Sequence, residues 1–340
     1  LLVGLPLTIL LGFAAAQLLM PGVGVWLALL LGAALAPTDA GLGAATVLNP
    51  VVPVRVRRIL NVESGLNDGL ATPVVLLAIA AAGGTSAGSG DTLAAAAGEL
   101  ALGVLVGVLL GAGSAWLLSR AHRAGQVDPG LLSVGVLAVP LACYYGALAA
   151  HGNGFVAAFV SGTAFAAVAG ELGGTEAGGD APDLETTASL SAVLGCAVWA
   201  LFGILGVAKL GTTATWRGLV FAVLSLTLVR MVPVALALVG SGLRRQTVLF
   251  VGWFGPRGLA SVVFALIAIE SLPDSSELEA VVGAITMTVL LSVVLHGVTA
   301  EPWAAAYGRW AARVRPSEEL GASVEPVPGR ARPRRARRVR

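Results

Sequence analysis

The sequence predicts an all-α polytopic membrane protein, and three observations lead to that fold class. Hydrophobic residues make up 56% of the 340 residues and charged residues only 12%, whereas a soluble domain carries about a quarter charged residues. The mean hydropathy is +0.88. Apolar runs recur along the chain, each close to the roughly 20 residues that a helix needs to cross a bilayer. A soluble protein built from buried helices would need far more polar surface.

The apolar runs divide the chain into ten predicted spans. Because such helices are apolar on most faces, their limits come from the polar or Gly/Pro-rich breaks between them. The ten ranges are 2–20, 25–48, 64–83, 93–118, 130–150, 154–170, 187–208, 216–240, 246–270 and 280–298. Residue 1 already lies in an apolar run and is not Met, so we expect the chain to begin partway through a longer protein.

The basic residues predict how these spans are oriented, since cytoplasmic connections carry an excess of Lys and Arg. The connections on one side hold only Lys209 and Arg217. The basic connections fall on the other side, with the C-terminus, and hold Arg55, Arg57 and Arg58, then Arg120 and Arg123, then Arg244 and Arg245. We therefore expect a plasma-membrane protein with a cytoplasmic C-terminal tail.

The chain divides into a transmembrane domain over residues 1–302 and a basic tail over residues 303–340. From Pro316 onward the tail is rich in Pro, Gly and Arg, a composition that predicts disorder. A solvated tail is the simplest interpretation. Beside a membrane span, the tail arginines would otherwise meet anionic lipid or fix the topology, and we do not expect nucleic-acid binding.

The second span is interrupted by the sequence Pro37-Thr38-Asp39-Ala40-Gly41. Proline lacks an N–H and glycine weakens a helix, so we expect local unwinding here. An unwound segment near the bilayer midplane exposes backbone carbonyls and half-helix termini, which can coordinate a cation. The Asp39 carboxylate and the Thr38 hydroxyl would add the hard oxygen ligands that small cations prefer.

The third span begins with the sequence Glu-Ser-Gly-Leu-Asn-Asp-Gly at residues 63–69. At helical spacing Ser64 and Asp68 lie on one face, with Asn67 and Glu63 beside them. An ionisable group beside apolar helix is expensive in a membrane and is by default a functional hypothesis. Asp68 can hold a proton or, when ionised, a cation, so the two would compete for one site.

Two arginines also lie inside apolar spans. Arg230 remains charged at any working pH and needs a carboxylate partner in an apolar bundle. Glu63 is the first candidate, with Asp39 and Asp68 as alternatives. The ninth span contains Gly-Trp-Phe-Gly-Pro-Arg-Gly at residues 252–258, whose glycines and proline predict a second broken helix with Arg257 at the break.

The two predicted breaks occupy corresponding positions in the chain. Spans one to three and eight to ten form triplets, and the middle helix of each triplet is interrupted beside charged residues. Spans one and eight differ by an odd number of crossings, so the two triplets are inverted. Paired interrupted helices in inverted halves indicate the binding site of a secondary transporter.

Four motifs carry a family resemblance: Pro-Thr-Asp at 37–39, Glu-Ser-Gly-Leu-Asn-Asp-Gly at 63–69, Gly-Phe-Val-Ala-Ala-Phe-Val-Ser-Gly at 154–162 and Gly-Trp-Phe-Gly-Pro-Arg-Gly at 252–258. They resemble the motifs of bacterial sodium/proton antiporters and of the animal sodium/hydrogen exchangers, over nearly all of residues 1–302. One Asn-Asp pair alone is weak evidence, but four motifs in the family's order at matching spans are specific.

The resemblance implies an inverted-repeat antiporter fold with two crossing interrupted helices and a mobile core that moves against a dimerising scaffold. It implies that Asp68 binds the ion and the proton with Asn67 beside it, and that Thr38, Asp39 and Ser64 complete a monovalent-cation site. Glu63 and Arg230 would form a structural ion pair, and Arg257 would stabilise the second crossing.

The resemblance also implies the transport chemistry and marks two departures. Na⁺ is the expected cation, with K⁺ or Li⁺ as alternatives, and an Asn-Asp pair is associated with electroneutral exchange of one cation for one H⁺. Ala40 stands where many relatives have Pro, and the family's first helices are missing, including part of the expected homodimer surface.

Other functions have less support from the sequence. A channel would need a continuous polar pore, and a regulatory protein of the same fold would not need Asp39 and Asp68. An enzyme is not expected, because no nucleophile–base set, HExxH motif or phosphate loop occurs in the sequence, and no cofactor is expected. We therefore expect a secondary transporter that serves pH and cation homeostasis.

Overall fold

The computed structural model describes residues 1–39, 41–43, 46, 49–83, 89–126, 129–172 and 185–320, and all of the regular structure in this part of the chain is helical. Irregular helical turns at Phe202–Gly206 and Val207–Lys209 connect α8 to α9. The α-helices are α1 (Gly4–Leu19), α2 (Val25–Ala34), α4 (Val54–Gly83), α5 (Ser89–Arg123), α6 (Pro129–Ala149), α7 (Gly154–Leu172), α8 (Glu185–Leu201), α9 (Leu210–Thr213), α10 (Trp216–Leu226), α11 (Leu228–Ala237), α12 (Arg245–Trp253), α13 (Leu259–Ser271), α14 (Ser276–Val314) and α15 (Ser317–Leu320).

Each of the ten predicted spans has a helical counterpart, and the third and the last are extended the most beyond the predicted limits. The third begins at Val54 instead of residue 64, and the last ends at Val314 instead of residue 298. By length and composition, five helical stretches of the described residues can cross a membrane: Val54–Gly83, Ala97–Arg123, Ser189–Thr213, Trp216–Ala237 and Ser276–Val314. Five shorter apolar helices accompany them.

Residues 303–314, which the sequence analysis assigned to the basic tail, are helical in the structure. These residues continue α14, with Pro302 inside the helix. Their buried side chains, Ala304, Tyr307 and Ala311, recur every three or four residues, and that spacing places them on one helix face. The face packs on the core, which keeps the segment helical beyond the apolar span. Residues 321–340 lie outside the described part of the chain.

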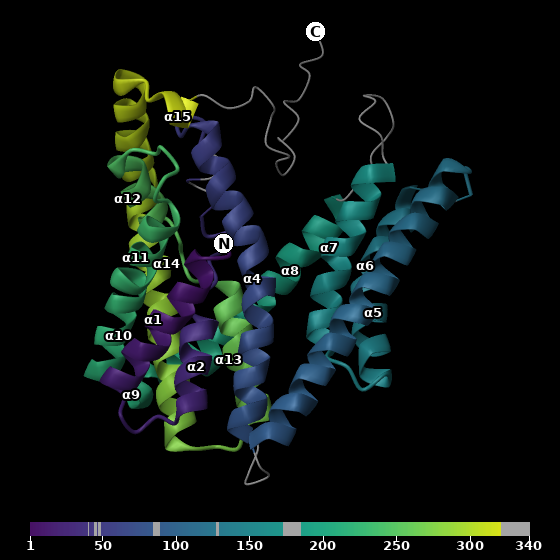
Figure 1. Cartoon of the computed structure of the whole chain (residues 1–340), viewed down its shortest axis with the longest axis horizontal. Coiled ribbons are helices and arrows are strands. Elements are labelled where there is room, and N and C mark those ends of the chain that lie inside the picture. Colours follow the sequence, from purple (N-terminus) through teal and green to yellow (C-terminus); the bar gives the residue numbers. More distant parts are fainter. Residues whose placement is uncertain are drawn as a thin grey trace.

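The helices form two groups that are visible in Figure 1. One group contains α1, α2, α4 and α10 to α14, and the other contains α5, α6 and α7. In the second group α5 and α7 approach very closely: a Cβ at Gly107 or Gly111 would meet the backbone of α7 at Ala157 and Ser161. Small residues that let helix backbones approach in this way are typical of packing within membranes.

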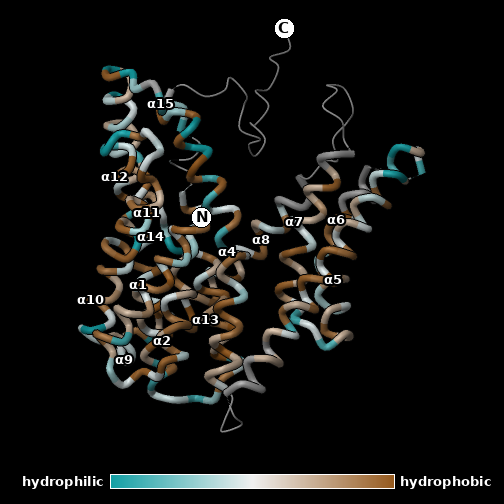
Figure 2. Tube along the Cα trace, in the orientation of Figure 1, coloured by the Kyte–Doolittle hydropathy of each residue, from teal (hydrophilic) through white to brown (hydrophobic). Residues whose placement is uncertain are grey.

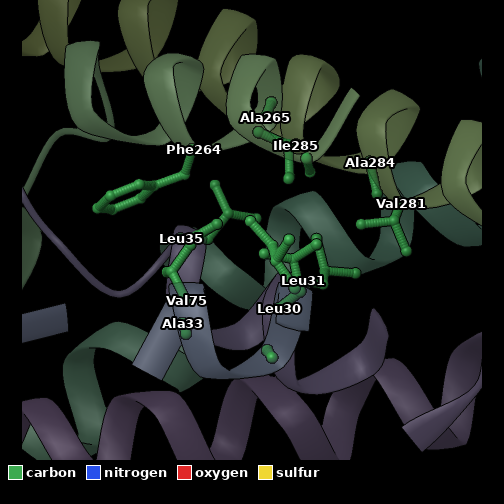
Figure 3. Close-up of a cluster of buried hydrophobic side chains, with 14 of the residues drawn as sticks. Leu30, Leu31, Ala33, Leu35, Val75, Phe264, Ala265, Val281, Ala284 and Ile285 are labelled. Atoms are coloured by element: carbon green, nitrogen blue, oxygen red, sulfur yellow. The ribbon is translucent and has the colours of Figure 1, made fainter. Parts of the chain in front are cut away.

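The core of the first group surrounds the N-terminal half of the first interrupted helix. Figure 3 shows Leu30, Leu31 and Leu35 facing side chains of α4, α13 and α14. Leu30 and Leu31 are fully buried. This packing fixes where α2 ends, and therefore where the break after it lies.

The outer surface of the helices is apolar. Leu109 on α5 and Val193 on α8 are 62% and 65% exposed. Figure 2 shows hydrophobic residues through the middle of the bundle and hydrophilic residues near α15 and near α9, at opposite ends. An exposed apolar belt between two polar ends is the surface expected of a multi-pass membrane protein.

Both predicted helix breaks are confirmed. α2 ends at Ala34, three residues before Pro37, and α12 and α13 are separated by residues 254–258. A third break, between α10 and α11 at Thr227, was not predicted. It has no Pro or Gly to mark it in the sequence.

The segment after α14 is attached to the first turn of α12. Glu319 on α15 is 2% exposed, and its Oε1 accepts hydrogen bonds from the Arg244 N–H (2.9 Å) and the Thr247 hydroxyl (2.7 Å). Glu318 pairs with Arg55 of α4 at 2.7 Å on the more exposed side. A carboxylate at a helix N-terminus satisfies free N–H groups and complements the helix dipole.

Glu319→Gln should loosen the first turn of α12. The bonds of a charged acceptor are worth about 1.5–3 kcal/mol, so hydrogen exchange at the Arg244 amide should speed up at least about tenfold. Glu318→Gln is the matched control, because its exposed ion pair contributes little. Equal protection in E319Q and wild type would contradict the assignment.

The same contact has a defined pH dependence. Burial opposes ionisation of Glu319, but the hydrogen bonds from Arg244 and Thr247 outweigh it and hold the pKa of this carboxyl below its ordinary value of 4.5. A lowered pKa in the folded protein contributes stability above the ordinary value, which is lost as the pH falls through the folded value. The difference between E319Q and wild type should therefore persist at neutral pH and disappear only in acid.

Candidate functional site

The two interrupted helices meet at their breaks. The Asp39 N–H donates to the Pro256 carbonyl at 2.8 Å. The Asp39 carboxylate accepts from the Leu259 N–H at 2.9 Å, at the first residue of α13, and also from Gly41 and Leu42 within its own break. A carboxylate at this helix N-terminus is favoured by the helix dipole.

Arg257 makes the reciprocal contact. Its guanidinium is fully buried and donates to the carbonyls of Leu35, Ala36 and Pro37, which follow the end of α2. A cation at a helix C-terminus satisfies carbonyls that the helix leaves free and complements the dipole. Each break thus carries a charge that compensates the half-helix end of the other.

Glycines in the 252–258 motif make room for these charged groups. A Cβ at Gly258 would overlap the Asp39 carboxylate, and a Cβ at Gly255 would overlap the Arg230 guanidinium. At these two positions, glycine is the residue that allows the side chain of another element to lie against the backbone.

Ser64 and Asn67 of α4 face the first break. The Thr38 hydroxyl lies 2.9 Å from the Ser64 hydroxyl and accepts a hydrogen bond from the Asn67 amide nitrogen at 2.8 Å. Thr38 and Asn67 are buried, at 2% and 1% exposure. The structure therefore brings together Thr38, Ser64 and Asn67, three of the five residues that the sequence assigned to the ion site.

Asn67 and Asp68 each present an oxygen that has no protein partner. Within the described part of the chain, Oδ1 of Asn67 and Oδ1 of Asp68 are buried and accept no hydrogen bond. Unpaired buried polar atoms are rare and call for an explanation, such as an ion or a proton that the site holds. The Asp39 carboxylate, in contrast, accepts hydrogen bonds from backbone N–H groups.

Arg230 is paired with Glu63, the first of its three candidate partners. Both guanidinium Nη atoms donate to the carboxylate, with Nη2 to Oε2 at 2.8 Å. Arg230 is 3% exposed, so this is a bidentate pair inside the bundle. It connects α4 to α11 at the residue directly before Ser64.

Helix α14 contacts the second break through Ser292 and His296. The Ser292 hydroxyl accepts from the Arg257 N–H at 2.7 Å, and His296 lies 2.8 Å from the Trp253 carbonyl, at the last residue of α12. The hydrogen bonds of His296 to the break are those of a capping residue.

Some of these hydrogen-bond partners could not be identified from the sequence. Ser292 and Ser225, whose carbonyl accepts from Arg257, are isolated serines in apolar helices. Their role depends on distances across the bundle. The sequence marked Gly255 and Gly258 as helix breakers. It did not show that the side chains of Arg230 and Asp39 lie against their backbone.

The chain is similar to known proteins over most of its length. A family model described as "Sodium/hydrogen exchanger, transmembrane" matches residues 1–306. No curated protein matches the chain significantly. Among solved structures, the sodium proton antiporter MjNhaP1 from Methanocaldococcus jannaschii at pH 8 is similar, with a TM-score of 0.67 and 21% identity over 89% of this chain and 76% of that chain. This likeness shows that the chain has the fold of that antiporter.

Proposed function

The chain belongs to the sodium/hydrogen exchanger family, and on that premise we propose that it exchanges Na⁺ for H⁺ across the plasma membrane, one for one. It is a multi-pass membrane transporter of the cation/proton exchange type and not an enzyme. The proposal assigns the exchange to Asp68 and to its surroundings at the crossing of the interrupted helices.

The proposal is carried by two buried oxygens, on Asn67 and Asp68, that have no hydrogen-bond partner among the residues that the structure describes. They lie on α4 beside the Thr38–Ser64–Asn67 hydrogen-bond network. Carboxylate, amide and hydroxyl oxygens are ligands that hard cations prefer, and a carboxylate is the one group among them that also takes up a proton. A single site of this kind can hold Na⁺ or H⁺, but not both.

The mechanism follows from the charge of that site. Asp68 releases its proton on one side of the membrane and binds the cation with Thr38, Ser64 and Asn67. Either ligand neutralises the carboxylate, and the neutral site can cross the apolar barrier. The empty, ionised site is held back by the cost of moving a charge through the bilayer, which couples the two ion flows.

The other charged residues have positioning roles in this proposal. Asp39 and Arg257 compensate the half-helix ends of the two breaks, and the Glu63–Arg230 pair holds α4 against α11. Asp39 was expected to be a cation ligand. Since its carboxylate already accepts three backbone N–H groups, we assign its main contribution to the crossing.

The remaining proposals concern the setting of this exchange. The protein acts as a homodimer in the plasma membrane, with its C-terminus in the cytoplasm and its basic tail near anionic lipid. It serves pH and cation homeostasis. The arginine-rich connections that support this orientation include Arg55 and Arg58 at the start of α4.

The function is tested with the full-length protein in sealed liposomes that contain a pH-sensitive dye. After a pH gradient is imposed, Na⁺, Li⁺ or K⁺ is added outside, at several membrane potentials set by ionophore. We expect Na⁺ to relax the gradient at a rate independent of potential. No response to any cation would refute exchange, and a current without proton movement would indicate a channel.

A further inference from the structure

The Gly-Phe-Val-Ala-Ala-Phe-Val-Ser-Gly motif of residues 154–162 has no part in the ion site as described so far. It begins α7, which belongs to the other group of helices. Its sixth residue, Phe159, reaches across to α4: a Cβ at Gly69 would lie within the Phe159 ring. Gly69 is buried and directly follows Asp68 in α4. The ring therefore occupies the place that a side chain at position 69 would take.

The neighbours of Phe159 extend this contact into an apolar seam. Val156 is buried in the core cluster that also contains Val75 of α4, and Val160 packs against that cluster. Residues 156, 159 and 160 share one face of a helix. On this face, Phe159 reaches α4 at Gly69, directly after Asp68.

Helix α7 is also fixed to α5, where the Cβ atoms of Val156 and Val160 lie close to Gly103 and Gly107. The backbone oxygens of Ala157 and Ser161 lie where a Cβ of Gly107 or Gly111 would be. The close approach leaves α7 little freedom relative to α5. Phe159 is therefore positioned by α5 and α7, whereas Gly69 belongs to the helix that carries the ion site.

We propose that Phe159 is a gate residue, whose ring covers the Asp68 site on the side of α5 to α7 and must leave Gly69 in each transport cycle. This inference rests on the proposed exchange function. The ring excludes water from one side of the carboxylate. An ionised, empty Asp68 would lose its hydration when it meets the ring, whereas a neutralised site would not. The gate thus helps to prevent the empty site from crossing.

The proposed gate requires glycine at position 69, because the Phe159 ring occupies the space that a side chain there would fill. Alanine there would displace the ring, while alanine at Gly65, one turn earlier on the same helix, meets no atom within 4 Å. Gly69→Ala and Gly65→Ala are thus matched variants with the same change in helix propensity. Removing the ring by Phe159→Ala makes room for a methyl group at position 69.

The experiment measures Na⁺ and H⁺ movements in parallel in liposomes that contain the full-length protein. We expect G69A to exchange at least about tenfold more slowly than G65A, since small displacements at a site are costly. G69A/F159A should recover much of the lost rate of Na⁺ movement, uncoupled from H⁺ because the ring is absent. F159A alone should move Na⁺ that is not accompanied by H⁺, whereas F159L, which keeps an apolar cover, should remain coupled.

Other results would overturn the gate. G69A exchanging as fast as G65A, or a double variant no faster than G69A, would show that the ring and position 69 do not act together. If G69A does not fold, the decision falls to F159A, and coupling as tight as in F159L would exclude a gate. If wild type itself shows no cation-dependent proton movement, the proposed function fails, and the gate fails with it.

Discussion

Asp68→Asn should abolish cation/proton exchange while leaving the fold intact. Asparagine is nearly isosteric with aspartate, but it takes up no proton and carries no charge. The site would then be neutral when empty and positively charged with a cation bound, so charge neutralisation would no longer couple the two flows. We expect the rate of Na⁺-dependent proton movement to fall by at least about a hundredfold, to the level of empty liposomes.

The control for this variant is Asp274→Asn, the same chemical change at an exposed residue between α13 and α14. It should exchange at the wild-type rate. Thermal unfolding in detergent shows whether D68N is folded. Exchange by folded D68N within a few-fold of D274N would mean that Asp68 is not the group that carries the ion and the proton.

The second large effect concerns the Glu63–Arg230 pair. Glu63→Leu leaves a guanidinium buried at 3% exposure without its carboxylate, and losing one partner of a buried pair costs about 3–5 kcal/mol. Arg230→Met likewise leaves the Glu63 carboxylate without its guanidinium partner. The Glu63 side chain is 20% exposed, so water can partly solvate its carboxylate when the arginine is removed. We therefore expect R230M to lose less stability than E63L.

The double variant E63L/R230M distinguishes a pair from two independent residues. Replacing both partners of a buried ion pair by apolar residues is often close to neutral. We therefore expect E63L/R230M to be more stable than E63L, with a coupling free energy of about 1–3 kcal/mol in the cycle. Reversible unfolding in mixed micelles measures it. Additive losses from the two single changes would rule out the pair as a unit.

The elements that the sequence predicted well are those marked by composition. Pro37 and the glycines of residues 252–258 interrupt apolar runs, and both breaks lie where these residues place them. The ten spans follow from the apolar runs themselves. The tail boundary was missed because α14 changes at its end from an apolar helix to one with a single packed face, which includes Tyr307.

The elements that could not be predicted depend on distances between helices. Arg257 was assigned to the second crossing, yet its guanidinium reaches the carbonyls after α2, more than two hundred residues earlier in the chain. Thr227 breaks a helix without Pro or Gly. For Gly69 and Phe159, the sequence offers two motif residues but no indication that they touch.

The coupling of the two ion flows is the central claim, and uphill transport tests it most directly. Liposomes containing the full-length protein would be made acidic inside, with labelled Na⁺ at equal concentrations on both sides. We predict that Na⁺ rises inside above its external concentration as protons leave, and that a protonophore or the D68N variant prevents the rise. Na⁺ that stays at its external concentration while wild-type protein dissipates the pH gradient would contradict antiport.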